Sequence, residues 1–288
     1  MTEPAEPASR HPPRVSRRVL LGGAAALGAA VAVDGVAITP RRLVTSLHTV
    51  GAAAGPRRLR LVQVSDLHVH GIGMRERQLF EQLHALKADV VVLTGDALDR
   101  PGALATLHTL LGEFPRSPRT FAILGNWEYR CGFTADDMAR LYDRHGIELL
   151  VNRSVTLEHE GAIVRITGLD DLLHGRPDAN GPLADAVPVA HHVVLAHCPL
   201  SRDAVRLPPR HAATFMLAGH SHGGQVAPFG FAPVLPHACG RYVAGWYHGD
   251  GPPLFVSRGI GTSFIPVRIG ASPELAVFDW QLATAAAS

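Results

Sequence analysis

The residues of this chain that could do chemistry follow short apolar runs, at the points where predicted strands end. A carboxylate or an imidazole in such a place is costly to bury unless a hydrogen-bond partner or a metal compensates it. One such residue is a weak signal, but the pattern recurs after five separate runs. In chain order, the residues are Asp66 and His68, Asp96, Asn126, His197, and the pair His220 and His222.

Strand ends of this kind meet at one edge of an open α/β sheet, where such sheets bind their ligands. We therefore expect the seven side chains to converge. Their imidazole and oxygen donors suit manganese, iron, zinc or cobalt, and they are too rich in nitrogen for calcium or magnesium alone. Seven ligands are too many for one transition metal, so the pattern predicts a centre for two ions.

The periodicity of the sequence predicts the elements that must position these residues. Residues 59–64 have the composition of a strand, and the runs 89–94 and 120–124 indicate strands buried on both faces. Helical spacing of apolar residues predicts helices over 75–87 and 102–112. Strands and helices that alternate in this way indicate a sheet with parallel strands.

Beyond this region, Thr134 and Asp137 form a capping-box pair that predicts a helix ending near His145. The remainder consists mainly of short strand-like runs, with weak helix patterns at 183–190 and 201–206. No internal repeat and no low-complexity linker is visible, so we expect one catalytic domain. The strand-like runs are 149–151, 154–158, 163–167, 192–196, 214–217, 254–256 and 275–280.

The order and spacing of five motifs resemble those of the calcineurin-like metallophosphoesterase superfamily. The motifs are Asp66-x-His68, Gly95-Asp96, Gly125-Asn126-x-Glu128, His197 and Gly219-His220-x-His222. The resemblance extends over residues 59–280 and implies an α/β fold, a four-layer αββα sandwich in which helices flank two mixed β-sheets. The tail 256–263, with Arg268 and 273–275, resembles the bacterial exported or membrane-associated branch.

The resemblance also implies a role for each of the seven residues. By motif position, Asp66, His68 and His222 would bind the first metal, Asn126, His197 and His220 would bind the second, and Asp96 would bridge both. The implied enzyme is a dinuclear metal-dependent phosphoric ester hydrolase, with phosphodiesterase activity expected. A hydroxide held between two divalent ions (manganese, iron or zinc) would attack phosphorus. No protein nucleophile is needed.

One position departs from the family pattern. Trp127 stands where family members usually carry a histidine that is thought to contact the phosphate and help to protonate the leaving group. An indole donates a hydrogen bond but does not titrate, so we assign no catalytic acid. This departure supports the alternative interpretation, a non-catalytic metal-binding protein that retains the fold. The candidate substitutes for the missing histidine are His70, His174, His237 and His248.

The N-terminus predicts an export signal or a membrane anchor. Residues 1–18 are polar, proline-rich and basic, and Val19 to Val33 carry no charge. This run is shorter than the roughly 20 apolar residues of a membrane span. Ser16-Arg17-Arg18 before it resembles a twin-arginine export signal. We expect residues 1–38 to be that signal or an anchor, cleaved or retained, and residues 39–288 to be the catalytic domain, exported or membrane-associated and extracytoplasmic.

Charge and cysteine content argue against a nucleic-acid-binding protein, a disulfide-stabilised fold and a zinc finger. The formal net charge is +2, and residues 1–18 alone account for it, so the rest of the chain is neutral and we expect no nucleic-acid partner. Three cysteines far apart make neither a disulfide framework nor a zinc finger. Five arginines and no acidic residue lie between Gly35 and Ser65, either against anionic head groups or on an edge strand. The expected partner is a phosphate-ester substrate, with lipid-linked and envelope-derived esters among the open alternatives.

Overall fold

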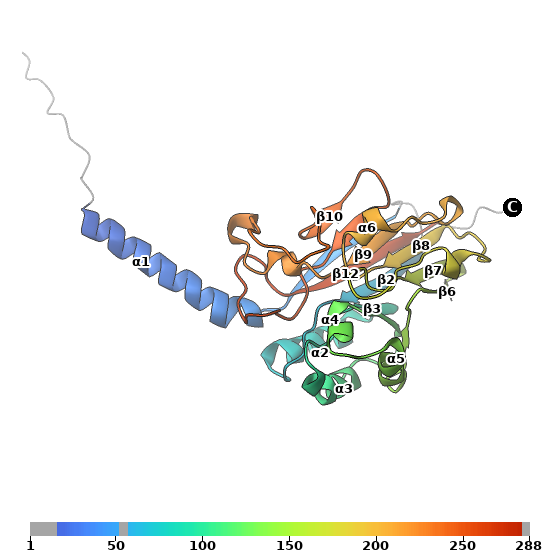
Figure 1. Cartoon of the computed structure of the whole chain (residues 1–288), viewed down its shortest axis with the longest axis horizontal. Helices are drawn as coiled ribbons and strands as arrows, with labels where there is room; N and C mark the ends of the chain where they lie inside the picture. Colours follow the sequence, from blue (N-terminus) through green and yellow to red (C-terminus); the bar gives the residue numbers. More distant parts are fainter. Residues whose placement is uncertain (1–15, 52–56, 284–288) are drawn as a thin grey trace, which may run out of the picture.

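The computed structural model describes residues 16–51 and 57–283. One helix, α1 (Arg17–Val33), projects away from a body built on two β-sheets (Figure 1). The helical path continues through two short turns, so the apolar candidate span runs from Arg17 to Arg41 and is longer than the charge-free run. By length and composition this segment could cross a membrane, and a signal sequence would pass the same test.

The first sheet is mixed, and its strand directions determine where the site lies. Strands β2 to β5 are parallel to one another, whereas β12 is antiparallel to β2 and β1 is parallel to β12. The beginning of β1 therefore lies at the edge where β2, β3 and β4 end. The strand order is β1 (Val44–Val50), β12 (Glu274–Leu282), β2 (Arg57–Val64), β3 (Val90–Thr94), β4 (Arg119–Ile123) and β5 (Ile147–Leu149).

The second sheet is also mixed. Strands β7, β8, β9 and β11 are parallel, and the antiparallel strands β6 and β10 flank them. The order is β10 (Gly245–Tyr247), β11 (Leu254–Val256), β9 (Phe215–Ala218), β8 (His191–Leu195), β7 (Ala162–Gly168) and β6 (Arg153–His159). The expected α/β sandwich of two mixed sheets is confirmed.

The core lies between the sheets and under the helices. Leu61, Phe121, Phe215 and Trp280 are buried in the cluster that joins the inner faces of the two sheets. The outer face of the first sheet packs against α2 (Met74–Leu86), α3 (Leu104–Gly112) and α5 (Ala135–Asp143). Figure 1 shows these three helices together on one side of the body. The outer face of the second sheet is covered by the short α6 (Ser201–Ala204) and loops.

Local signals explain most helix boundaries. The hydroxyl of Thr134 accepts the backbone N–H of Asp137, whose carboxylate accepts the N–H of Thr134, so the predicted capping box starts α5. The helix predicted over 183–190 is wrong. The structure has one 3-10 turn at Gly181–Leu183, and Pro188 cannot donate the hydrogen bond that a continuing helix needs.

The arginines that follow the apolar segment divide into two groups. Arg41 and Arg42 are exposed at the base of α1. Arg58 and Arg60 lie on β2 and form ion pairs with Asp279 of β12 at 3.4 and 2.8 Å. Because β2 lies between β12 and β3, the expectation of arginines on an edge strand is wrong for this pair.

The packing of the two sheets predicts a stability difference between two leucines. Leu61 is fully buried between the sheets, whereas Leu47 on the edge strand β1 is 72% exposed. Leu61→Ala should lower the free energy of unfolding by about 2–5 kcal/mol, because it leaves a cavity. The control Leu47→Ala should change it by less than about 0.5 kcal/mol. Denaturant unfolding measures both, and equal effects would contradict this packing.

Candidate metal centre

The structure brings all seven sequence-predicted residues to the edge where the parallel strands of both sheets end. Asp66 and His68 follow β2, Asp96 follows β3, and Asn126 begins α4 (Asn126–Arg130) after β4. From the second sheet, His197 follows β8, and the pair His220 and His222 follows β9. Each of these side chains is buried. The two sheets therefore face each other with their polar strand ends side by side.

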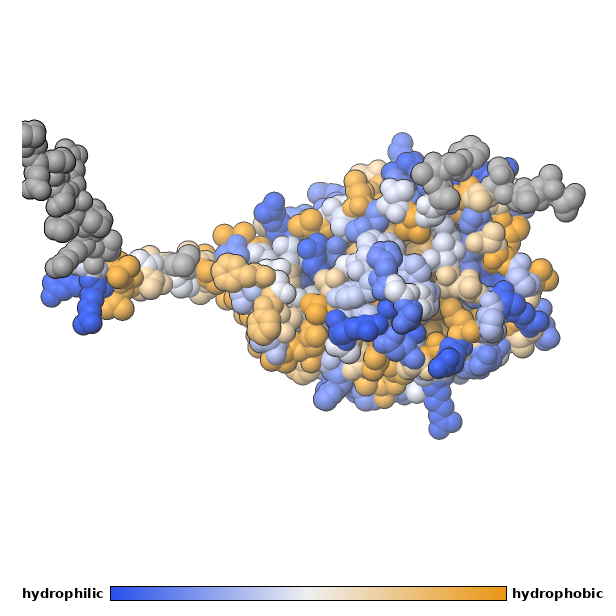
Figure 2. Space-filling model, turned by 90° about the horizontal axis from the view of Figure 1, so that it is seen from above, coloured by the Kyte–Doolittle hydropathy of each residue, from blue (hydrophilic) through white to orange (hydrophobic). Residues whose placement is uncertain are grey.

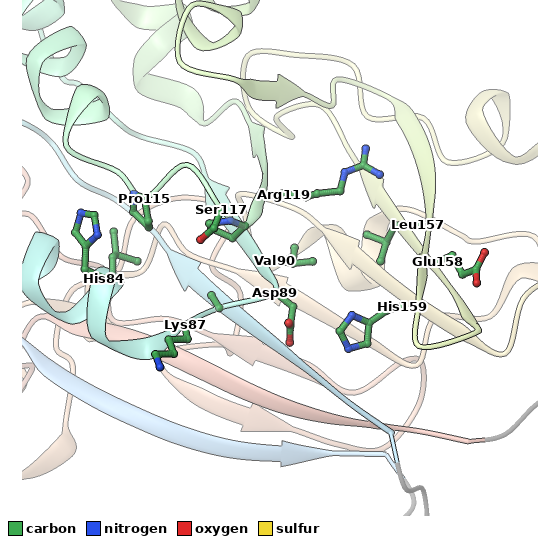
Figure 3. A pocket seen from close by; sticks show the side chains of 13 residues that line it. His84, Lys87, Asp89, Val90, Pro115, Ser117, Arg119, Leu157, Glu158 and His159 are labelled. Carbon is green, nitrogen blue, oxygen red and sulfur yellow. The ribbon is translucent and has the colours of Figure 1, made fainter.

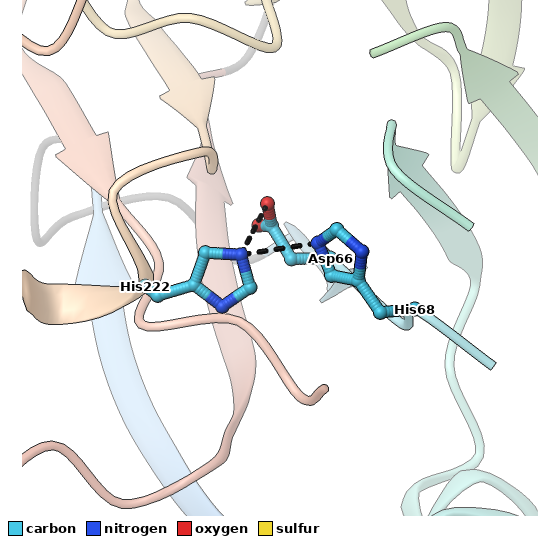
Figure 4. Close-up of side chains that lie close together, drawn as sticks. All are labelled: Asp66, His68 and His222. Carbon is cyan, nitrogen blue, oxygen red and sulfur yellow. Dashed lines mark hydrogen bonds and ion pairs between the residues drawn. The ribbon is translucent and has the colours of Figure 1, made fainter. Parts of the chain in front are cut away.

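One cluster consists of Asp66, His68 and His222, which Figure 4 shows pointing toward one another. Their donor atoms all lie within 4.8 Å of one another. Nε2 of His222 is 3.1 Å from Nε2 of His68 and 3.6 Å from Oδ1 of Asp66. Two ring nitrogens and a carboxylate oxygen thus surround one small volume.

The second cluster consists of Asp96, His197 and His220, whose donor atoms also lie within 4.8 Å of one another. Nε2 of His197 is 3.2 Å from Oδ2 of Asp96 and 3.1 Å from Nδ1 of His220. The amide oxygen of Asn126 lies 3.2 Å from the same Nε2 atom. This cluster therefore offers two nitrogen and two oxygen donors.

Asp96 stands between the two clusters. Its Oδ2 atom lies 3.2 Å from Nε2 of His197 in one cluster and 3.6 Å from Nε2 of His68 in the other. Its Oδ1 atom accepts the backbone N–H of Trp127 at 2.9 Å. The backbone thus fixes one oxygen of this carboxylate, and the other oxygen faces both clusters.

Hydrogen bonds to backbone carbonyls set the tautomers of two histidines. Nδ1 of His197 donates to the carbonyl of Thr94 at 2.8 Å, which leaves the Nε2 lone pair toward the cluster. Nε2 of His220 donates to the carbonyl of His237 at 2.6 Å, which leaves its Nδ1 lone pair free in the same way. In the neutral form of each ring, the nitrogen that faces the cluster is therefore the unprotonated one.

Burial also favours the metal-binding form of the imidazoles. It lowers the pKa of His68 to about 4 and the pKa of His220 to about 4, so both rings are neutral at pH 7. Burial raises the pKa of Asp66 to about 6. Burial opposes the charges of Asp96 and His197, but their ion pair lowers the pKa of Asp96 and raises that of His197. A cation beside this buried carboxylate would take the place of the imidazole proton.

The backbone at the site is not extended, although in an extended strand residues two apart, such as Asp66 and His68, would point the same way. Strand β2 ends at Val64, and Asp66 and His68 have φ values of 50° and 39°. Asp96, His220 and His222 also have positive φ. The left-handed conformation costs free energy in residues other than glycine, and strained residues of this kind cluster at functional sites. The convergence is therefore as expected, but left-handed turns produce it rather than side-chain alternation along a strand.

Close approach of the backbone explains one glycine of the motifs. A Cβ atom at Gly125 would collide with Oδ1 of Asp96. The main chain after β4 can therefore lie against the carboxylate that stands between the clusters only because this residue has no side chain.

Two residues support the site in ways that sequence reasoning did not assign. The buried carboxylate of Glu128 accepts the N–H groups of Ala97 at 2.6 Å and Gly125 at 2.9 Å, which ties the loops after β3 and β4 together. The buried Arg268 donates to the carbonyls of Arg258 and Ala271 behind His222. The spacing of Gly125 and Glu128, typical of a helix N-terminus, was a signal for Glu128. Arg268 stood out only as part of the tail pattern, and no local pattern indicated its hydrogen bonds behind His222.

A cleft of about 760 Å³ opens above the clusters. Trp127 forms part of its wall, with its ring 5.5 Å from that of Phe264 and the Arg130 guanidinium 4.1 Å from the ring centroid. His174 and His237 also line the cleft. His70 is half-exposed instead, and its Nε2 atom lies 2.7 Å from Asp99.

A second cleft, of about 570 Å³, lies at the opposite edge of the first sheet. Figure 3 shows Asp89 and Arg119, at the amino ends of β3 and β4, together with His159 of β6 around it. It contains none of the seven predicted residues. The Asp89 carboxylate accepts the N–H of Arg60 at 2.7 Å and so supports the sheet edge.

Similar proteins occur in bacteria and animals. The uncharacterized metallophosphoesterase YkuE of Bacillus subtilis is 29% identical over 283 residues, which cover 92% of this chain and 97% of that protein. The phosphodiesterase YaeI of Escherichia coli is 27% identical over 197 residues, 67% of this chain and 70% of that protein. A transmembrane protein with metallophosphoesterase domain from Bos taurus is 28% identical over 235 residues, 75% of this chain and 52% of that protein.

The family model of the calcineurin-like phosphoesterases matches residues 59–224. This range contains every residue of the two clusters and extends from β2 to the loop after β9. The chain belongs to the calcineurin-like phosphoesterase family.

Proposed function

We propose that this chain is a metal-dependent phosphodiesterase whose seven buried residues hold two divalent transition metal ions. The observation that carries the proposal is the place of Asp96, whose Oδ2 atom faces His197 in one cluster and His68 in the other. A carboxylate oxygen shared in this way suits a bridge between two cations. Manganese, iron and zinc match the donors.

The donor set fits such ions on physical grounds. Four buried imidazoles and two buried carboxylates converge at the site. A buried carboxylate is costly without a compensating charge, and neutral imidazole is the ligand form. When these rings are neutral, the hydrogen bonds of His197 and His220 to backbone carbonyls leave the unprotonated nitrogen of each toward its cluster.

Bound there, two divalent ions would supply a hydroxide nucleophile and neutralise the phosphoryl oxygens. The chain's own part is to place the ligands and to shape the cleft. The loops that carry Asp96 and Asn126 are held against each other by two groups. The backbone N–H of Trp127 donates to Asp96, and the carboxylate of Glu128 accepts the N–H groups of Asp96 and Gly125. No protein nucleophile is assigned.

The cleft walls favour a diester over a monoester. A diester has a second ester substituent that the cleft walls can contact, whereas a monoester has none. Among the described residues, Arg130 is the one arginine or lysine that lines this cleft, whereas Val234, Phe264 and Ile265 give it apolar walls. A singly charged diester with an apolar substituent matches this lining, and the name of the similar phosphodiesterase YaeI agrees with it.

A substrate and metal screen tests the proposal. The purified full chain, supplied in turn with manganese, zinc, iron and magnesium, is assayed on bis(4-nitrophenyl) phosphate and on 4-nitrophenyl phosphate. We expect turnover of the diester to exceed that of the monoester, with manganese, iron or zinc bound. A folded sample that binds metal and hydrolyses neither ester would favour the alternative, a non-catalytic metal-binding protein.

We further propose that residues 1–38 direct the catalytic domain, residues 39–288, to the extracytoplasmic side of the membrane. Arg17 and Arg18 form the first turn of α1, and the side chain of Ser16 caps it by accepting the N–H of Val19. This arrangement supports either a twin-arginine signal or an anchor that follows a basic segment.

Export should depend on the arginine pair. Arg17→Lys/Arg18→Lys keeps both positive charges but removes the guanidinium groups that the twin-arginine machinery is expected to recognise. The variant should accumulate inside the cell, as measured by protease protection in intact cells. A matched Arg41→Lys/Arg42→Lys variant, changed at the other end of the span, should be exported. If the Arg17→Lys/Arg18→Lys variant is exported normally, the segment is a general secretory signal or a plain anchor.

A further inference from the structure

Three exposed apolar side chains line the cleft above the clusters, and two more lie in the loop between Val226 and Pro233, two residues that also line it. We call these five the apolar rim: Phe229, Phe231, Val234, Phe264 and Ile265. The three that line the cleft are Val234, Phe264 and Ile265. Phe229 is fully exposed, at 108%, and contributes nothing to the core of the chain. A single exposed apolar residue is ordinary, but a group of them at one cleft indicates an interaction surface.

Two aromatic residues of the rim are held in an unfavourable backbone conformation. Phe229 and Phe264 have φ values of 55° and 61°, the left-handed region that favours glycine. A bulky residue in that region costs free energy, and neither side chain recovers it by burial, because both are strongly exposed. The stability of the isolated chain therefore does not explain why aromatic residues stand here.

The rim loops are joined to the base of α1. The N–H of Arg268 donates to the carbonyl of Gly35 at 2.9 Å, just after α1. Ile269 in turn pairs with the other rim loop, since it accepts from Ala227 at 2.7 Å and donates to Gln225 at 2.9 Å. Figure 1 shows these loops gathered where α1 meets the body, and Figure 2 shows hydrophobic atoms clustered on the surface at that end.

The strand directions put the base of α1 at the same edge as the clusters. Strand β1 begins at Val44, three residues after the candidate span, at the edge where β2 ends. Arg41 and Arg42 lie exposed beside this base, where their charges complement an anionic surface. Arg58 and Arg60 lie instead on β2 and are paired with Asp279.

We propose that the apolar rim contacts an anionic lipid bilayer beside α1, and that the cleft draws its substrate from that bilayer. The substrate class is an amphiphilic phosphodiester whose phosphate reaches the metal centre while its acyl chains remain in the bilayer. Hydrolysis breaks one ester P–O bond; water supplies oxygen to phosphorus and a proton to the departing alkoxide. This inference rests on the proposed function, because it names the substrate class of the same site.

Contact of the rim with the bilayer is tested by fluorescence. The full chain is reconstituted in vesicles of phosphatidylcholine and phosphatidylglycerol with brominated acyl chains, which quench tryptophan at the membrane. Phe229→Trp should add fluorescence that the bromines quench, after subtraction of the unsubstituted protein. The control Val187→Trp replaces an exposed residue (74%) of the β7–β8 connection and should add unquenched fluorescence. Equal quenching at the two positions, or none at 229, would overturn the proposal.

The origin of the substrate is tested with Phe229→Ser/Phe231→Ser, two rim residues that do not line the cleft. Hydrolysis of phosphatidylglycerol in vesicles should fall about tenfold, because two apolar contacts with the bilayer are lost. Hydrolysis of dibutyryl phosphatidylglycerol in free solution should be unchanged. Val187→Ser should alter neither rate.

The outcomes separate the two proposals. If the unsubstituted chain hydrolyses the soluble diester but not the vesicle lipid, or if the double variant loses both rates equally, the bilayer substrate is wrong and the phosphodiesterase stands. If residue 229 is quenched but the unsubstituted chain, with metal bound, hydrolyses neither lipid nor aryl diester, the phosphodiesterase is wrong and the membrane contact stands.

Discussion

Asp96→Asn should lower turnover of an aryl phosphodiester by more than about a hundredfold. The loss of a residue that only supports a metal ligand typically costs about 10–100-fold, and Asp96 faces both clusters directly. Asparagine keeps the shape of the side chain and can still accept the N–H of Trp127. It removes the negative charge that would hold two cations together, so metal content should fall with activity.

Two aspartates serve as matched controls for this change. Asp89→Asn, at the opposite edge of the first sheet, should leave both turnover and metal content near normal. Asp99→Asn should have an intermediate effect, because its carboxylate lies 3.7 Å from Nδ1 of His68 rather than at the clusters. Near-normal turnover and full metal content in Asp96→Asn would show that this carboxylate does not bridge two ions.

Trp127→His should change how the rate depends on the leaving group. A general acid contributes about 10²–10⁴-fold, and most where the leaving group is poor. The unsubstituted chain, with an indole at this position, should cleave aryl esters readily and alkyl esters slowly. Histidine at 127 should raise the turnover of alkyl esters and flatten the dependence of the rate on leaving-group pKa.

The position of Trp127 calls for a control that separates the loss of side-chain volume from the gain of a titratable group. The main chain of Trp127 is bound to Asp96, and its ring lies between Arg130 and Phe264, so a smaller side chain leaves a gap in the wall. Trp127→Phe makes a similar gap without a titratable group and should leave the slope steep. If Trp127→His retains both metals and the slope does not change, the proton comes from elsewhere, and His174 and His237 in the cleft are then the next positions to substitute.

The sequence predicted the central part of the fold because short-range signals dominate there. The run Val90–Leu93 is apolar throughout, and the strand Val90–Thr94 is fully buried. Strand β1 was not predicted, because Val44–Val50 mixes polar and apolar residues and its partner β12 lies at the far end of the chain. Strand β10 was also missed: it has three residues, and an antiparallel pairing with β11 defines it.

The types and order of the site residues were visible in the sequence. The backbone conformation of these residues and most of the hydrogen bonds that hold their loops in place were not. Strand-end motifs identify Asp66 and Asp96 as site residues, but their positive φ depends on loops closed by distant partners. The spacing of Gly125 and Glu128 indicates one hydrogen bond of Glu128, but its bond to Ala97 and those of Arg268 join segments distant in the sequence and follow no spacing rule. The pairing of the two rim loops could not be predicted either, because the side chain of Gln225 donates to the carbonyls of Ser263 and Ile265, which lie far along the chain.

The amount of metal bound per folded chain tests the central claim most directly. The full chain is loaded with manganese or zinc, freed of excess metal by dialysis, and analysed for metal and protein on the same sample, with circular dichroism to verify folding. We predict two ions per chain for the unsubstituted protein, and fewer for His68→Ala in one cluster and for His220→Ala in the other. One ion or none in the folded, metal-supplied protein would contradict the dinuclear centre.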